Sequence, residues 1–265
     1  MTDQVNRTIQ RSFEVLDYLS AANRPVRLKE IVASLGYPTS SASDVLKSLV
    51  MLGYLNFDRD IMSYTLTPRI TTLGTGLNDA LWQDERIMLG LQRLAALTGG
   101  TVGLGVQSDI YAQYITVIHS VKQPTYELRP GAIRPVTRSG IGWALLSQRD
   151  DEEIERLRRR VNAKQQDRAL HVGAAALAAQ IAGVRRTGYA FSRNTFHPGI
   201  GIIAMPLPRP VGGRWCAMGA AGTVEDLDRD EQAITAELRE IVSGWQDSSD
   251  EKFAMAKIEG GPLNP

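Results

Sequence analysis

The sequence predicts an α+β protein with two domains: a small helical domain that ends in a β-hairpin, and a larger domain built on an antiparallel sheet. The chain has 265 residues, more than one typical domain, and its 43% hydrophobic content is enough for two cores. Helical periodicity dominates the first third, whereas β-branched and alternating stretches begin after Gly99. We therefore divide the chain into a first domain (1–67), a linker helix (68–82), a second domain (83–250) and a C-terminal tail (251–265).

Three short helices are expected in the first domain. The first covers 5–20 and has an apolar stripe formed by Ile9, Phe13, Leu16 and Leu19. The second has apolar residues at helical spacing over 28–35 and stops at Gly36. The third begins after Pro38, with Thr39 or Ser40 as its N-cap, and ends near Gly53. Its buried stripe consists of Ala42, Val45, Leu46 and Leu49.

A β-hairpin follows the third helix. Apolar and polar residues alternate over 54–57 and 63–66, and the polar sequence Asp58-Arg59-Asp60 lies between these two runs. Helix, helix, tight turn, helix and hairpin are the order of a winged helix-turn-helix, whose third helix enters the major groove of DNA. The alternative is a winged helix that contacts only protein, which an absence of salt-dependent DNA affinity would favour.

The rest of the chain predicts a sheet flanked by helices. The leucine-rich stretch 68–98 indicates two helices with a weak point at Gly74 and Gly76. Strands are expected at 101–106, 111–121, 189–192, 200–205 and 214–221, and helices at 141–147, 150–161 and 174–187. A last helix follows an acidic stretch that begins at Asp226, and its apolar face consists of Ile234, Leu238, Ile241 and Trp245.

Composition favours a cytoplasmic protein without a membrane partner. The longest apolar stretch is far short of the roughly 20 residues that a membrane span needs, and the polar N-terminus lacks the apolar region of a secretory signal. The single cysteine, Cys216, has no partner for an intramolecular disulfide, which fits a reducing compartment. Because the net charge is only +1, binding of nucleic acid would depend on a local basic face.

The sequence offers no catalytic, metal or cofactor site, so we expect that the protein is not an enzyme. Its histidines, His119, His171 and His197, lie in different predicted elements without metal-ligand spacing, and no serine stands in a G-x-S-x-G elbow. The glycines of 199–204 match a dinucleotide fingerprint, but they lie inside a predicted strand that runs into prolines. An enzyme built on the second domain remains the other alternative.

Several blocks of sequence resemble the IclR-type bacterial transcription regulators. In the first domain these blocks are 11–16, 28–36, 39–49 and 53–54, and in the second they are 131–135, 139–142, 186–189, 199–206 and 214–222. Their order and spacing are together specific. The resemblance implies a GAF-like α/β effector-binding domain, a dimer or tetramer, and control of a nearby catabolic operon by a small organic acid. The implied partners are a double-stranded DNA operator, that effector, and further copies of the chain.

Residues on and around the third helix are the candidates for contact with DNA. They are Arg11, Arg27, Thr39, Ser40, Ser41, Ser43, Asp44, Lys47 and Arg59. Asp44 is unusual, since the family more often has a basic residue near this position. A carboxylate repels phosphates, and its usual base partner in the major groove is the cytosine amino group. Asp44 therefore either reads a cytosine or holds a neighbouring Arg or Lys, and we favour the second, structural role.

The resemblance places the effector between the start of one helix and the sheet. The implied lining residues are Ser139, Gly140, Trp143, Ile202, Met218, Gly219 and Ala221. The helix N-terminus near Ser139 offers backbone N–H groups to a carboxylate. Trp143 stands where a lysine is usual, and Gly219 and Ala221 stand where hydroxyl groups often help to hold the acid. We therefore expect an aromatic or heteroaromatic carboxylate that stacks near Trp143, unless Trp143 is a core residue.

Overall fold

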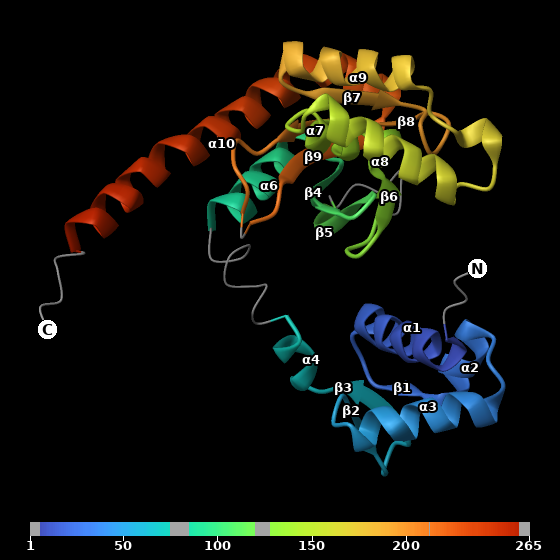
Figure 1. The fold of residues 1–265 in the computed structure, drawn as a ribbon. Helices are drawn as coiled ribbons and strands as arrows, with labels where there is room; N and C mark the ends of the chain where they lie inside the picture. The colour runs from blue at the N-terminus through green and yellow to red at the C-terminus, as the bar shows by residue number, and fades with distance from the viewer. Residues whose placement is uncertain (1–5, 75–84, 120–127, 212, 260–265) are drawn as a thin grey trace, which may run out of the picture. The chain divides into compact units, whose positions relative to one another are not determined.

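A computed structural model describes residues 6–74, 85–119, 128–211 and 213–259, with side chains described up to 244 (Figure 1). The chain divides into two compact units, Met1–Asp79 and Ala80–Pro265, and each is described by itself. In these ranges, no helix has the length and apolar character required to cross a membrane.

The first unit has the predicted order of three helices and a hairpin. Its helices are α1 (Arg7–Ala22), α2 (Leu28–Leu35) and α3 (Thr39–Met51), and its strands are β1 (Val26–Arg27), β2 (Leu55–Asp58) and β3 (Ser63–Leu66). The antiparallel sheet has the order β1-β3-β2. Strand β1 was not predicted, because two residues are too few to display alternation. Of the predicted linker helix, the described residues contain only α4 (Arg69–Thr72), and 75–84 lie outside them.

The buried face of α1 corrects the predicted stripe. Val15 and Leu19 are buried, whereas Ile9 and Phe13 are 55% and 60% exposed. The helix has apolar residues on more than one side, and only the neighbouring helices decide which side becomes core. Its N-cap is Asn6, whose side chain accepts hydrogen bonds from the N–H groups of residues 8 and 9.

Helix α3 buries the four residues predicted for its core, and Gly36 ends α2 in the left-handed region as expected. The N-cap, however, is Pro38 and neither Thr39 nor Ser40. The chain is extended at Pro38 and already helical at Thr39, and no side chain caps the first turn. The N–H groups in the first turn of α3 therefore have no side-chain cap.

The second unit is a six-stranded antiparallel sheet with the order β6-β5-β4-β9-β8-β7. Its strands are β4 (Thr101–Ser108), β5 (Tyr111–His119), β6 (Ile133–Pro135), β7 (Ala190–Arg193), β8 (Ile200–Pro206) and β9 (Cys216–Thr223). The five predicted strands are present with shifts of one or two residues at their ends; the last two residues of the predicted strand 111–121 lie outside the described ranges. Strand β6 has only three residues and was not predicted.

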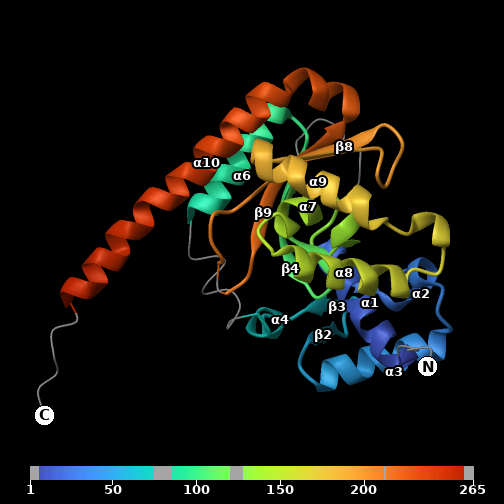
Figure 2. The same ribbon diagram turned by 45° about the horizontal axis from the view of Figure 1, so that its top comes forward.

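Helices cover both faces of this sheet (Figures 1 and 2). One layer consists of α7 (Gly140–Leu146), α8 (Asp151–Lys164) and α9 (Ala174–Thr187), and the other of α6 (Glu85–Thr98) and α10 (Val224–Glu259). Each layer has its own buried cluster. Adjacent residues of β8 and β9 divide between the clusters: Ile202 and Ala221 belong to the first, and Ile203 and Ala220 to the second.

Helix α10 is longer than predicted and continues to Glu259, through part of the segment assigned to a tail. No proline or glycine interrupts the sequence between Gly244 and Gly260, so nothing in it favours an earlier end. Ile234 and Leu238 are buried as expected, and the side chain of Trp245 lies outside the described part.

Candidate functional site

The exposed side of α3 gathers most of the residues expected to contact DNA. Ala42, Val45, Leu46 and Leu49 occupy the buried side, and the residues left exposed or half-exposed on the other sides include Thr39, Ser40, Ser41, Ser43, Asp44 and Lys47. These six residues lie along one helix without deep burial, so a groove of DNA could reach them together.

Arg11 joins this group from another helix. Its guanidinium donates a hydrogen bond to Ser41 Oγ and lies 5.0 Å from the ring centroid of Tyr37. This places a cation beside the uncapped first turn of α3, where backbone N–H groups and the helix dipole favour an anion. The Arg11 guanidinium and the N–H groups at the start of α3 together have the chemistry to bind one DNA phosphate.

The remaining basic candidates lie at the edges of the unit. Arg27 precedes α2 and is exposed, and its backbone N–H donates to Glu30 (3.0 Å). Arg59 is exposed at the hairpin tip, which is shaped by the Asp58 carboxylate accepting from the N–H groups of residues 60 and 61. Arg24 instead forms an ion pair with Glu30 at 2.8 Å, which neutralises its charge.

Asp44 lies exposed in the middle of α3 without the partner that a structural role requires. Within the described ranges, no Arg or Lys pairs with its carboxylate, and only its backbone carbonyl has a side-chain contact, from Ser48 Oγ at 2.8 Å. The favoured expectation, that Asp44 holds a neighbouring basic residue, therefore finds no support in the first unit.

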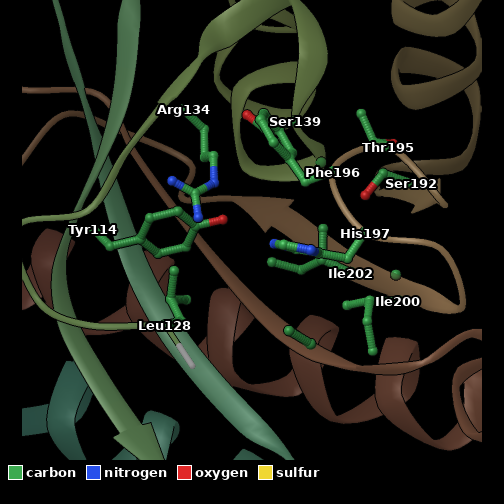
Figure 3. Close-up of a pocket in the computed structure, with 13 residues that line it drawn as sticks. Tyr114, Leu128, Arg134, Ser139, Ser192, Thr195, Phe196, His197, Ile200 and Ile202 are labelled. Carbon is green, nitrogen blue, oxygen red and sulfur yellow. The ribbon is translucent and has the colours of Figure 1, made fainter. Parts of the chain in front are cut away.

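The second unit contains a pocket between the start of α7, strand β8 and the loop that joins β7 to β8 (Figure 3). It holds about 430 Å³ between protein atoms, including space open to solvent. Its lining consists of Tyr114, Leu128, Arg134, Ser139, Gly140, Ser192, Thr195, Phe196, His197, Ile200, Gly201, Ile202 and Ala221. Apolar walls with a few polar groups are typical of a small-molecule site.

Ser139 and Gly140 fix the start of α7 against the sheet. Ser139 is 3% exposed, and its hydroxyl oxygen accepts from the Gly142 N–H at 3.0 Å, while its carbonyl accepts from the Trp143 N–H at 2.8 Å. A Cβ at Gly140 would lie 2.4 Å from Ile202 Cγ2, so only glycine allows this approach. The Ser139 side chain therefore takes up the Gly142 N–H, one of the N–H groups at this helix start that the sequence analysis assigned to a carboxylate.

Arg134 and His197 supply cationic or polar groups that sequence reasoning did not find. In Figure 3 both side chains point into the same space, from β6 and from the β7–β8 loop. The Arg134 guanidinium carbon lies 4.9 Å from the Phe196 ring centroid. The loop is closed by the Asn194 side chain, whose oxygen accepts from the Gly199 N–H at 2.6 Å, and this closure holds Phe196 and His197 toward the pocket.

The structure brings together four of the seven residues implied for the effector site: Ser139, Gly140, Ile202 and Ala221. Met218 lies in the cluster on the opposite face of the sheet, because adjacent strand residues point to opposite sides. At Gly219 a Cβ would lie 2.6 Å from the Ile203 carbonyl oxygen of the paired strand β8, so the backbone of that strand leaves no room for a side chain. Trp143 is half-buried against the first cluster, and its Nε1 donates to the Thr137 carbonyl at 2.9 Å. These three residues do not line the pocket.

Family models match both units. Residues 8–59 match the IclR helix-turn-helix domain, and residues 85–245 match the C-terminal domain of bacterial IclR transcriptional regulators. The chain belongs to the IclR family. This confirms the resemblance, the winged helix-turn-helix and the effector domain with its antiparallel sheet. Members of the IclR family are DNA-binding transcription regulators and not enzymes, which settles the enzyme alternative.

Individual IclR proteins are similar over most of the chain. The glycerol operon regulatory protein of Streptomyces coelicolor is 28% identical over 91% of this chain and 92% of its own. The crystal structure of an IclR effector domain from Acinetobacter is 30% identical with a TM-score of 0.59, covering 64% of this chain and 98% of that one. An IclR homologue from Microbacterium hydrocarbonoxydans, crystallised with 4-hydroxybenzoate, has a TM-score of 0.59 at 21% identity, over 88% and 99% of the two chains, and shows the same fold.

Proposed function

We propose that this IclR-family regulator binds an operator through α3 and that an aromatic carboxylate in the pocket of the second unit changes that binding. The observation that carries the proposal is an apolar pocket with Arg134 at its side. The governed genes would form a nearby catabolic operon, and the protein would act in the cytoplasm, where that DNA lies.

Arg134 is the group we assign to the effector carboxylate. A guanidinium binds a carboxylate through two parallel hydrogen bonds, which neither a hydroxyl nor an amide matches. Its contact with the Phe196 ring holds the guanidinium on one side of the pocket. Arg134 thus takes the role in binding the carboxylate that the sequence analysis assigned to the N–H groups at the start of α7.

The remaining lining favours an aromatic body on that acid. Leu128, Ile200 and Ile202 offer apolar surface, and Phe196 offers a ring for edge or offset stacking. Phe196 thereby takes the stacking role expected for Trp143. The related protein crystallised with 4-hydroxybenzoate supports this class of ligand. Ser192 and Thr195, on a different side of the pocket in Figure 3, could bind a polar substituent of the ring.

The proposal includes self-association and transmission between domains. A dimer would present two copies of α3 to a pseudo-palindromic operator, and the effector would change their spacing through the linker 68–82. The exposed Ile9 and Phe13 lie one helical turn apart on α1, and a second copy of the chain would cover them. A dimer or tetramer in analytical ultracentrifugation is expected, and a monomer at every concentration would contradict this part.

Calorimetry tests the effector assignment directly. We expect benzoate and 4-hydroxybenzoate to bind the full-length protein, and Arg134→Ala to abolish that binding. Trp143→Phe, a change outside the pocket, is the matched control and should leave it intact. Binding of glyoxylate or pyruvate with no binding of the aromatic acids would overturn the proposed ligand class.

A further inference from the structure

We propose that Asp44 selects cytosine at one position of the operator. The inference rests on the proposed function in one respect, since α3 must lie in the major groove. It deepens that function by naming the residue that reads a base and the base that it reads.

The position of Asp44 relative to the phosphate anchor is the first argument. Arg11 and Ser41 lie together at the first turn of α3, where the helix start favours a phosphate. Asp44 follows Ser41 by three residues, a rise of about 4.5 Å along the helix axis. If a phosphate contacts the first turn, the Asp44 side chain lies roughly one turn further along the helix, where base edges rather than the backbone are reached.

The second argument is that the fold itself makes no use of the carboxylate. Asp44 is exposed, and in the part of the chain that the structure describes, no side chain or backbone group hydrogen-bonds to its carboxylate oxygens. Lys47 stands at i+3, a spacing that allows ion pairs on helices, yet the two form none. The carboxylate is therefore available to a donor outside the protein.

The chemistry of the groove restricts which donor that is. An ionised carboxylate only accepts hydrogen bonds. In the major groove, guanine presents two acceptors and thymine presents an acceptor and a methyl group, so neither offers a donor. Adenine offers its amino group beside the N7 acceptor, which repels a second acceptor, whereas the cytosine amino group is the usual partner of Asp and Glu. Cytosine is thus the base that Asp44 accommodates.

Repulsion adds to this selectivity. A carboxylate at the surface of DNA faces the phosphate charge and weakens binding to every sequence. Only the cytosine contact compensates for this, so Asp44 penalises incorrect sites more than the correct one. Asp44 should therefore lower non-specific affinity while it increases discrimination.

The test is selection of bound DNA from a randomised duplex library, with the full-length wild type, Asp44→Asn and Asp44→Ala. Wild type should require cytosine at one position, with a loss of about 5- to 150-fold when that base is changed in an individual site. Asp44→Asn should change the preference at that position alone to adenine, because asparagine pairs with the adenine amino group and N7. Asp44→Ala should remove the preference there and raise affinity for random DNA.

Asp17→Asn is the control, because it removes the same charge from an exposed position on α1. It should leave the preferred sequence unchanged. If both Asp44 variants keep the wild-type preference at every position while wild type remains sequence-specific, the assignment to Asp44 is wrong and the proposed function stands. If wild type selects no sequence at all, the proposed function fails and the inference fails with it.

Discussion

Arg11 of α1 donates a hydrogen bond to Ser41 in the first turn of α3, across thirty residues of sequence. The same guanidinium lies over the Tyr37 ring, in the turn that joins α2 to α3. One side chain therefore links the first helix, the turn and the start of the third helix. We propose that Arg11 is a phosphate contact whose position these interactions fix before DNA binds.

Replacing Arg11 should weaken binding to all DNA sequences alike. Arg11→Ala removes one cation from the phosphate backbone, so the slope of log affinity against log salt should fall by about 1. Fluorescence anisotropy over a salt titration measures this. Arg24→Ala is the control, because Glu30 already neutralises that charge. A changed sequence preference with an unchanged salt slope would mean that Arg11 reads bases instead.

Substitutions at Arg134 and Trp143 should have different effects on how 4-hydroxybenzoate changes the affinity of the protein for operator DNA. In Arg134→Ala, addition of 4-hydroxybenzoate should no longer change DNA affinity, while Trp143→Phe should retain the wild-type response. Losing the Nε1 hydrogen bond to the Thr137 carbonyl should cost Trp143→Phe about 1–3 kcal/mol of stability. A normal effector response in Arg134→Ala would remove this residue from the site.

The sequence predicted regular elements well and the pocket only in part, for a physical reason. The helix 174–187 and the strand 200–205 are periodic over many residues, and periodicity is a local property. Arg134 and Phe196 meet because two short segments distant in sequence converge, and a three-residue strand such as β6 has no detectable period. Met218 could have been excluded from the sequence alone, since it alternates with Gly219 and Ala221 along one strand.

Replacing two helical glycines by alanine should change the stability of the protein in opposite directions. At Gly142 a Cβ would lie 2.1 Å from the Val136 carbonyl oxygen, so α7 must shift, at a cost of about 1–3 kcal/mol. At Gly183, inside α9, a Cβ meets nothing within 4 Å, and the change should stabilise by about 0.5–1 kcal/mol.

Tryptophan fluorescence during urea unfolding measures both variants. All four tryptophans follow residue 80, so the signal reports on the second unit. Destabilisation by Gly183→Ala, or no loss of stability in Gly142→Ala, would contradict this prediction.

Cys216 should be chemically inert in the folded protein. Its side chain is fully buried, and this burial raises the pKa of the thiol to about 11. Since the thiolate is the nucleophile, iodoacetamide at pH 8 should leave Cys216 unmodified until urea unfolds the second unit. Mass spectrometry detects the adduct. Rapid modification without denaturant would mean that β9 opens readily.

The most direct measurement is binding of the full-length protein to labelled DNA from upstream of its own gene, with excess competitor DNA, a salt titration, and 4-hydroxybenzoate present or absent. We expect competitor-resistant binding that weakens steeply with salt and changes when the aromatic acid is added. Weak binding that is equal for every sequence and unaffected by the acid would contradict the account of an effector-controlled, sequence-specific regulator.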